Sequence, residues 1–330
     1  MKKNIIKLWE LIKKSKKILL INHIRMDMDA FWSLSSIYTI LNSLNKNVKA
    51  VNDELTINSF SFLWYNHIIE TNLDIEKFKP DLIISFDAAS KEQLWNTYKD
   101  NEDIFKNTNF VVIDHHKTNS WFGDINIIDP NYSSTCELTY DIIHSLNLNK
   151  YITPGIATSL LSWIYTDTNI FYNSNTTSNT YLVASELIKS WADFRKPYYE
   201  LYKKKTFNKS QLWWEILANH LKISENWKIS WAIIPKTTFS KTNTSDRDTT
   251  WIISEFFANI EWVEICFISY ELENKKVKTS FRSTKNIDST IIASHFWWGW
   301  HKQACWFTSN KTLKQIELEI LEQIKKQFNF

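Results

Sequence analysis

Eight acidic and imidazole side chains have types and spacings that suit chemistry assisted by metal ions. Carboxylates gathered at one place repel each other strongly unless a cation lies among them. Carboxylate and imidazole ligands without thiolate suit Mn²⁺ first, with Mg²⁺ as the alternative. Two such ions about 3.5–4 Å apart are typical of phosphoester hydrolysis. The eight residues are His23, Asp27, Asp29, Asp87, Asp114, His115, His116 and Asp167.

Each of these residues also has a simpler explanation when it is taken alone. An Asp directly after a strand often caps the following helix by accepting hydrogen bonds from its first turn. For any single residue that explanation is as good as metal binding. The helix-cap explanation is weaker for the whole set. Several strands would then bring carboxylates to one edge of the sheet with no cation between them to offset their repulsion.

Short apolar runs predict the strands that bring these side chains together. Residues 18–21, 82–86 and 110–113 each end beside one of the polar groups, and helical spacing of apolar residues follows the first run. Strands that alternate with helices predict an α/β domain with a doubly wound, mainly parallel sheet. Such sheets bind ligands beyond the carboxyl ends of their strands. The helical stretch 154–165 would deliver Asp167 to the same edge.

The second half of the chain predicts a smaller α/β domain. Residues 229–234 and 263–270 have the pattern of strands, and 276–281 predict a third strand that pairs with the second. Residues 312–328 predict an amphipathic closing helix. We expect a catalytic, metal-binding domain at 1–188, a polar linker at 189–209 and a substrate-binding domain at 210–330, with the active site in the cleft between the domains.

Composition limits the classes of protein that this chain can belong to. Its 330 residues suit two domains, and a net charge of +3 gives no strong overall attraction to nucleic acid. No apolar run approaches the ~20 residues of a membrane span, and the Lys-rich N-terminus lacks the pattern of a signal peptide. The three cysteines lie far apart, which predicts free thiols in a reducing cytoplasm. We therefore expect a cytoplasmic protein without a membrane partner.

The arrangement His23-x3-Asp27-x-Asp29, followed by Asp87, the triplet at 114–116 and Asp167, resembles the four motifs of the DHH phosphoesterase family. That family includes RecJ-type exonucleases, manganese pyrophosphatases and the oligoribonucleases called nanoRNases. Residues 114–137, 166–168 and 175–177 resemble the nanoRNase branch. In the second half, residues 280–283 and 297–304 resemble the DHH-associated domain.

The resemblance implies a role for each of the eight residues. His23, Asp27 and Asp87 would hold one divalent ion, and Asp87 would bridge to a second. That second ion would be held by Asp29, Asp87, His115 and Asp167. Asp114 would orient a histidine. His116 would contact the substrate phosphate and protonate the leaving oxygen, while a hydroxide between the metals attacks phosphorus in line.

The resemblance also implies the substrate contacts and the reaction. Arg282 would pair with phosphate oxygens through its planar guanidinium group. The implied reaction is the hydrolysis of short oligoribonucleotides; whether 3′-phosphoadenosine 5′-phosphate is also a substrate stays open, as does a homodimer. The alternatives are a RecJ-like single-strand DNA exonuclease, a phosphodiesterase for cyclic or linear dinucleotides, and a non-catalytic nucleotide-binding module. The implied substrate-binding residues are Asn119, Arg282, Ser283, Gly299 and His301.

The chain departs from the family pattern in three places and in its glycine content. Met26 and Met28 stand where the family usually has Pro and Gly, and Tyr172 stands where nanoRNases often have Arg. The chain has 3 Gly and 17 Trp, whereas about 7% of residues are usually Gly. Several tryptophans stand at positions where the family has glycine: Trp32, Trp163, Trp262, Trp297, Trp298, Trp300 and Trp306.

Two explanations compete for these tryptophans. They are genuine residues of an altered protein, or they mark UGA codons that the source organism reads as glycine. Steric crowding in a loop that must approach a phosphate favours the second explanation. Trp9 and Trp121 fit no clear glycine position and stay open.

Overall fold

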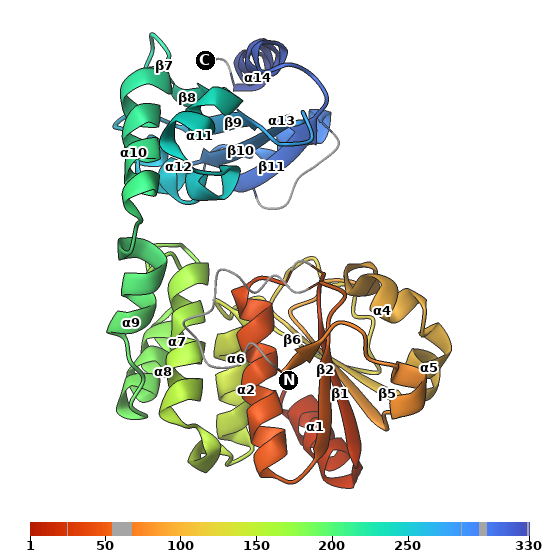
Figure 1. Ribbon diagram of the computed structural model, residues 1–330. Coiled ribbons are helices and arrows are strands. Elements are labelled where there is room, and N and C mark those ends of the chain that lie inside the picture. The colour runs from red at the N-terminus through yellow and green to blue at the C-terminus, as the bar shows by residue number, and fades with distance from the viewer. Residues whose placement is uncertain (25, 55–67, 285, 297–301, 329) are drawn as a thin grey trace. The chain divides into compact units, whose positions relative to one another are not determined.

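The computed structural model describes residues 1–24, 26–54, 68–284, 286–296, 302–328 and 330 (Figure 1). These residues form two compact units, Met1–Lys203 and Lys204–Phe330, each with its own sheet and core. The boundary falls inside the stretch 189–209 that the sequence suggests as a linker. Much of that stretch is helical, with α9 (Arg195–Tyr198) followed by a π-helical turn (Tyr199–Lys203).

The first unit is built on a six-stranded sheet in which every neighbouring pair is parallel. The order is β3-β2-β1-β4-β5-β6, so the chain reverses its direction of winding between β1 and β4. In sheets of this kind the ligand crevice lies at the reversal, outside the carboxyl ends of the strands. The strands are β1 (Lys17–Asn22), β2 (Asn47–Val51), β3 (Ile69–Glu70), β4 (Leu82–Phe86), β5 (Asn109–Asp114) and β6 (Ile125–Ile128).

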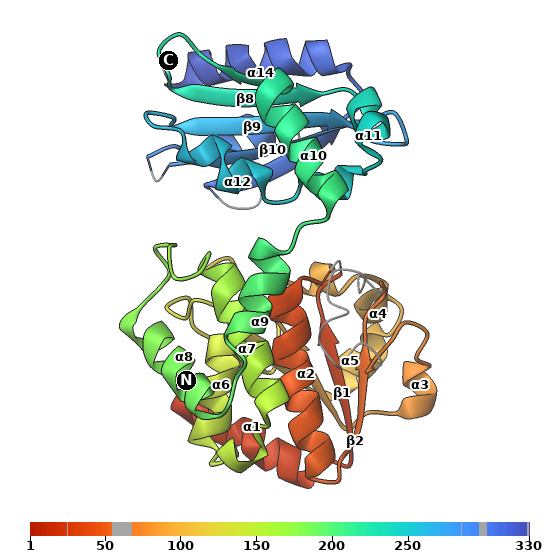
Figure 2. The ribbon, with the colours of Figure 1, turned by 60° about the vertical axis from the view of Figure 1, so that its left-hand side comes forward.

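Helices cover both faces of this sheet, which confirms the predicted doubly wound α/β fold (Figures 1 and 2). All five residues of β4 are buried because neither face reaches solvent. On one face α1 (Lys2–Lys14), α2 (Met28–Ser43) and α6 (Thr135–Ser145) pack against the sheet. The helices α7 (Pro154–Asp167) and α8 (Ser178–Lys189) extend the same core, with α7 packed on α2 and α6, and α8 packed on α7 and α6. The other face packs against α3 (Ile75–Phe78), α4 (Trp95–Lys99) and α5 (Glu102–Asn107).

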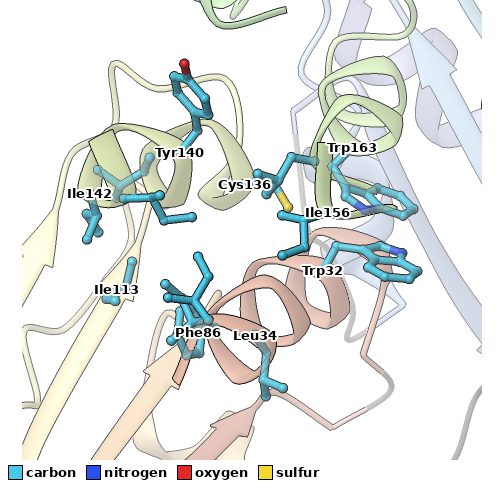
Figure 3. Close-up of a cluster of buried hydrophobic side chains, with 14 of the residues drawn as sticks. Trp32, Leu34, Phe86, Ile113, Cys136, Tyr140, Ile142, Ile156 and Trp163 are labelled. Carbon is cyan, nitrogen blue, oxygen red and sulfur yellow. The ribbon is translucent and has the colours of Figure 1, made fainter. Parts of the chain in front are cut away.

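Figure 3 shows part of the larger core. Trp32 of α2, Cys136 of α6 and Trp163 of α7 are among its buried side chains. All three cysteines of the chain are buried free thiols, as the sequence predicts. Among the described residues, no helix is long and apolar enough to cross a membrane.

The second unit contains a five-stranded sheet of order β11-β10-β9-β8-β7. β8 and β9 are parallel, and the other neighbours are antiparallel. The strands are β7 (Leu221–Ile223), β8 (Ile229–Ile234), β9 (Ile265–Glu271), β10 (Val277–Ser283) and β11 (Ala304–Ser309). The antiparallel pairing of β9 with β10 confirms the strand pair predicted from the sequence.

Helices also line both faces of the second sheet (Figure 2). One core contains side chains of α10 (Phe207–Glu215), α11 (Lys236–Thr242) and α12 (Ile252–Glu255). The other contains side chains of α13 (Thr290–His295) and α14 (Leu313–Phe328). The last helix is the predicted amphipathic closing helix, and its apolar positions Ile316, Ile320 and Ile324 are fully buried.

Candidate metal centre

Three strand ends and two helix ends deliver the eight residues. β1 is followed by His23, β4 by Asp87, and β5 ends at Asp114, while α7 ends at Asp167. Asp27 is the N-cap of α2, and its side chain accepts a hydrogen bond of 3.1 Å from the backbone N–H of Ala30. The simpler explanation of Asp27 as a helix cap is therefore correct, and it is compatible with a second role at the centre.

His23, Asp27 and Asp87 form the first group of possible ligands. The Nε2 atom of His23 lies 3.8 Å from Oδ1 of Asp27 and 3.7 Å from Oδ2 of Asp87. These separations are too long for hydrogen bonds. The ligand atoms of the three residues lie within 4.8 Å of one another, close enough to share one cation.

His115 lies at the middle of the second group. Its Nε2 atom is 3.9 Å from Oδ2 of Asp29, 3.8 Å from Oδ1 of Asp87 and 3.9 Å from Oδ2 of Asp167. Asp87 therefore presents Oδ2 to His23 and Oδ1 to His115. A carboxylate that serves two neighbouring cations has this arrangement of its two oxygens.

The electrostatics of these carboxylates fit a site for divalent cations. Burial raises the pKa of Asp29 well above its usual value, and the negative charges of Asp87 and Asp27 raise it further. Burial, together with the charges of Asp29, Asp27 and Asp87, does the same to the pKa of Asp167. Such a cluster either keeps protons or holds cations, because buried like charges cannot all ionise unaided. The oxygen and imidazole donors suit Mn²⁺ or Mg²⁺.

The backbone of Asp87 is held in an unusual conformation. Its φ is 57°, in the left-handed region that most side chains avoid. The backbone N–H of Asp87 donates a 2.9 Å hydrogen bond to the carbonyl oxygen of Ile113, which continues the pairing of β4 with β5. Conformations of this kind often occur at functional sites, where the surrounding structure enforces them.

Asp114 and His116 form a hydrogen-bonded pair beside Asp87, and the ligand atoms of Asp87, His115 and His116 also lie within 4.8 Å of one another. Nδ1 of His116 lies 2.7 Å from Oδ1 of Asp114 and 3.6 Å from Oδ1 of Asp87. Burial alone would lower the pKa of His116, but the hydrogen bond to Asp114 and the charges of Asp87 and Asp114 raise it to about 10. These contacts favour the imidazolium form of His116, and Asp114 is placed to orient the ring.

Asn119, which the sequence suggests as a substrate contact, has its side chain in hydrogen bonds within the protein, beside Asp114. The residue is buried, and its Nδ2 donates to Oδ2 of Asp114 at 2.6 Å and to the carbonyl oxygen of Ala88 at 3.0 Å. Its Oδ1 accepts from the backbone N–H of Trp121 at 2.7 Å. Because both amide protons are used inside the protein, the side chain supports Asp114.

The N-terminus of α6 makes contacts to which sequence reasoning assigned no role. The backbone N–H groups of Thr135 and Cys136 donate to Oδ2 and Oδ1 of Asp29 at 2.5 and 2.8 Å. The hydroxyl of Thr135 donates to Oδ1 of Asp87 at 2.7 Å. A signal existed in the sequence, because Ser134 has the residue type of an N-cap and accepts from the N–H of Glu137.

Asn175 is a second residue that sequence reasoning left without a role. Its Nδ2 donates to the carbonyl oxygen of Asp167 at 3.1 Å and to that of Ser133 at 3.0 Å. Asn173 also donates to the carbonyl oxygen of Asp167, at 3.1 Å. The end of α7 is thereby tied to the turn that precedes α6. Tyr172, which stands where nanoRNases often have Arg, is 80% exposed.

In the second unit, the structure describes two of the four expected substrate-binding residues. Nε of Arg282 donates to Oγ of Ser254 at 3.1 Å, and Nη1 donates to the carbonyl oxygen of Phe281 at 2.7 Å. Burial lowers the pKa of Arg282, and no carboxylate of the described residues forms an ion pair with it. The hydroxyl of Ser283 donates to the carbonyl oxygen of Ile287 at 2.8 Å. Gly299 and His301, with Trp297, Trp298 and Trp300, lie outside the described residues.

Comparison with known proteins gives one family and several relatives. Residues 17–166 match the DHH family, N-terminal domain. A protein of Mycoplasma genitalium named bifunctional oligoribonuclease and PAP phosphatase NrnA is 31% identical over 188 residues, which is 56% of each chain. A protein of the same name from Thermus thermophilus is 26% identical over 329 residues, 94% of this chain and 90% of the relative.

A solved structure shares the fold over the whole chain. The crystal structure of an exopolyphosphatase-related protein from Bacteroides fragilis superposes with a TM-score of 0.89 and 21% identity. The match covers 100% of this chain and 98% of that protein. At this identity the likeness establishes a common fold.

Proposed function

Because this chain is a phosphoesterase of the DHH family, we propose that it hydrolyses short oligoribonucleotides and 3′-phosphoadenosine 5′-phosphate. The partly buried cluster of carboxylates and imidazoles at the carboxyl ends of β1, β4 and β5 carries this proposal. The substrate class is supported by relatives with the name oligoribonuclease and PAP phosphatase, one of which matches 94% of this chain.

Two divalent cations, Mn²⁺ first and Mg²⁺ second, are the proposed cofactors. His23, Asp27 and Asp87 would hold one, and Asp29, Asp87, His115 and Asp167 the other. When bound, such ions supply positive charge to the phosphoryl oxygens and lower the pKa of a water molecule. The distances of 3.7–3.9 Å between the Nε2 atoms of the two histidines and the carboxylate oxygens support these two groups.

His116 is the proposed general acid of the reaction. Oδ1 of Asp114 accepts a hydrogen bond from the N–H at Nδ1 of His116 and holds the ring, so that Nε2 carries the second proton of the imidazolium. Hydrolysis of a phosphoester leaves an alkoxide oxygen that needs a proton, and a positioned acid typically accelerates such a step by about 10²–10⁴-fold. The raised pKa of His116, about 10, keeps that proton available at neutral pH.

Arg282 is the proposed contact to a second phosphate or to the far end of the substrate. Its guanidinium group is neutralised by no described carboxylate, and only two of its hydrogen-bond donations go to described residues. An arginine without a carboxylate partner is suited to binding an anion, because the donors of its planar guanidinium group match two phosphate oxygens. Ser283, Gly299 and His301 remain proposed partners from the family resemblance.

The test is a turnover assay with Mn²⁺ on a panel of phosphoesters. The panel contains a ribodinucleotide, a 20-residue RNA, single-stranded DNA, cyclic di-AMP, pyrophosphate and 3′-phosphoadenosine 5′-phosphate. We expect the ribodinucleotide and the adenosine bisphosphate to be the best substrates, with no turnover after chelation of metal. Preference for single-stranded DNA, cyclic di-AMP or pyrophosphate would overturn the substrate assignment, and no turnover of any of them would overturn the proposed reaction.

A further inference from the structure

We propose that Thr135 is a positioning residue that holds Asp29 and Asp87 in the arrangement that binds cations. The inference rests on the proposed metal centre and adds a determinant of its affinity. Thr135 is fully buried at the first position of α6. It donates from its backbone to Asp29 and from its hydroxyl to Asp87, so that one residue reaches a carboxylate of each ligand group.

The hydroxyl contact controls the rotation of the Asp87 carboxylate. Torsion about the last bond of an Asp side chain is soft, so neighbouring groups decide where its oxygens point. Oδ1 of Asp87 accepts from Thr135, which leaves Oδ1 3.8 Å from Nε2 of His115 and Oδ2 3.7 Å from Nε2 of His23. Loss of this hydrogen bond frees the carboxylate to turn away from one histidine, and the two ligand groups then no longer share it.

The turn before α6 is rigid enough to serve as a support. Glu137 is fully buried and accepts from the backbone N–H of Ser133 at 3.0 Å, from Nδ2 of Asn179 at 2.7 Å and from the hydroxyl of Thr180 at 3.1 Å. These contacts join the turn to the start of α8. Thr135 therefore presents its hydroxyl from a fixed backbone, as expected of groups that orient metal ligands.

The same helix provides a matched control. Thr139 lies one turn after Thr135 on α6, is equally buried, and its hydroxyl has no hydrogen-bond partner among the described residues. Thr139→Val removes a buried hydroxyl from α6 without touching a ligand. A comparison of Thr135→Val with Thr139→Val thus separates the contact to Asp87 from the general effect of changing a buried threonine.

The experiment is a calorimetric titration of the full metal-free chain with Mn²⁺ alone. We expect Thr135→Val to lower Mn²⁺ affinity by about 10- to 100-fold, the effect typical of lost contacts behind metal ligands. Thr135→Ser, which keeps the hydroxyl, and Thr139→Val should bind Mn²⁺ within about threefold of the parent. Thermal unfolding without metal checks that each variant is folded, and Thr135→Ala replaces Thr135→Val if the extra methyl group prevents folding.

The results of these titrations test the role of Thr135 and the proposed metal centre separately. Parental Mn²⁺ affinity in a folded Thr135→Val or Thr135→Ala variant overturns the positioning role and leaves the metal centre intact. Equal losses in Thr135→Val and Thr139→Val also overturn it, because the effect is then one of packing. If the parent itself binds no Mn²⁺, the proposed metal centre fails, and the role of Thr135 falls with it.

A separate observation, the backbone conformation of the tryptophans, carries a second inference. Within the described part of the chain, fifteen residues other than glycine have positive φ. Tryptophan makes up 17 of the 330 residues, so chance alone would put about one Trp among the fifteen. Six of the fifteen are Trp. The six are Trp95 (50°), Trp121 (56°), Trp191 (65°), Trp227 (62°), Trp251 (77°) and Trp262 (71°).

The surroundings of these side chains do not explain the conformation. Trp191 and Trp262 are 82% and 68% exposed, so their indole rings gain little from burial. Glycine adopts positive φ without steric conflict, whereas other side chains crowd the backbone there. We infer that the six positions carry glycine in the natural protein. Glycine would stand there if the source organism reads the UGA codon as glycine.

The backbone conformations change the set of tryptophans that the sequence suggests as glycine positions. Trp121, which fits no clear glycine position in the family pattern, joins the set on its φ of 56°. Trp262 stays in it. Trp32 and Trp163 are buried within α2 and α7 (Figure 3) and are not among the residues with positive φ. Their backbone conformation therefore gives no reason to replace them with glycine.

The experiment compares Gly with Ala at the same position, which removes the indole in both variants. At Trp191 and Trp262 the Gly variant should melt about 2 °C or more above the Ala variant. Trp214, an exposed residue inside α10, is the matched control, and there Ala should melt above Gly. Ala equal to or above Gly at Trp191 and Trp262 overturns the inference.

Peptide masses of the protein isolated from its natural source decide the identity of the residue directly. Glycine at the six positions supports the inference, and tryptophan at them overturns it.

Discussion

Asp87 gives the sharpest test of the metal centre, and Asp87→Asn is the variant to use. Its φ of 57° would strain alanine, whereas Asn tolerates the left-handed region. Asn also keeps an oxygen that can accept from the hydroxyl of Thr135. The change therefore removes one negative charge and one shared ligand with little other disturbance of the fold.

The expected effect of Asp87→Asn on stability depends on whether metal is bound. Two unit charges about 5 Å apart interact by roughly 3 kcal/mol at an effective dielectric constant of 20. Without metal, loss of the Asp87 charge relieves Asp29 and Asp167 but also removes the attraction of Asp87 to His23 and His116, so the free energy of unfolding of the variant should stay within about 3 kcal/mol of the parent value. With Mn²⁺ at 100 times its Kd, the parent gains about 2.7 kcal/mol, or roughly 5–10 °C in Tm. Asp87→Asn should lose that gain.

The expected effect on turnover follows from the charge that the ions supply. If the metals stabilise the transition state by about 3–4 kcal/mol, their loss lowers kcat/KM by about 10²–10³-fold. The assays are thermal unfolding with and without Mn²⁺ and hydrolysis of a ribodinucleotide. Asp103→Asn, an equal charge change in the first turn of α5, should alter neither. Turnover of Asp87→Asn within tenfold of the parent, or an undiminished Mn²⁺ shift in Tm, would refute the two-metal assignment.

Three further predictions concern the proton donor and the substrate. Asp114→Asn removes the charge that raises the pKa of His116, so the alkaline limb of the kcat/KM profile should move to lower pH by about 1–3 units; an unmoved limb would exclude His116 as the acid. A ribodinucleotide should be hydrolysed faster than a 20-residue RNA in single-turnover assays, and the reverse order would favour a processive exonuclease. Arg282→Ala should raise KM with kcat nearly unchanged, because a contact far from the reacting phosphate binds ground and transition states alike. A large fall in kcat at constant KM would instead put Arg282 at the reacting phosphate.

The sequence by itself determined the parallel sheet of the first unit and the gathering of the proposed ligand residues at its edge. The strands 18–21, 82–86 and 110–113 are nearly continuous apolar runs, because both faces of a doubly wound sheet are covered by helices. The carboxyl ends of parallel strands share one edge, so the residues that follow them meet there. The sequence also indicated the antiparallel pair β9–β10 and the closing helix α14 through period-2 and helical patterns.

Only the tertiary structure decided which side chains face the centre and which stand behind it. Asn119 belongs to the same motif as His116, yet its amide donates to Asp114 and to the carbonyl oxygen of Ala88. Residue types and spacing cannot reveal this, since an Asn side chain is equally able to bind a protein group or a phosphate.

The support from Thr135 was likewise hidden from the sequence. It depends on a contact between residues 48 positions apart, from the start of α6 to the end of β4. Such contacts form only when the helix packs on the sheet, and no local pattern encodes which donor then meets which carboxylate. The left-handed tryptophans were equally undetermined, because the amino-acid sequence records a residue type and the backbone torsion follows from the turn that the fold requires.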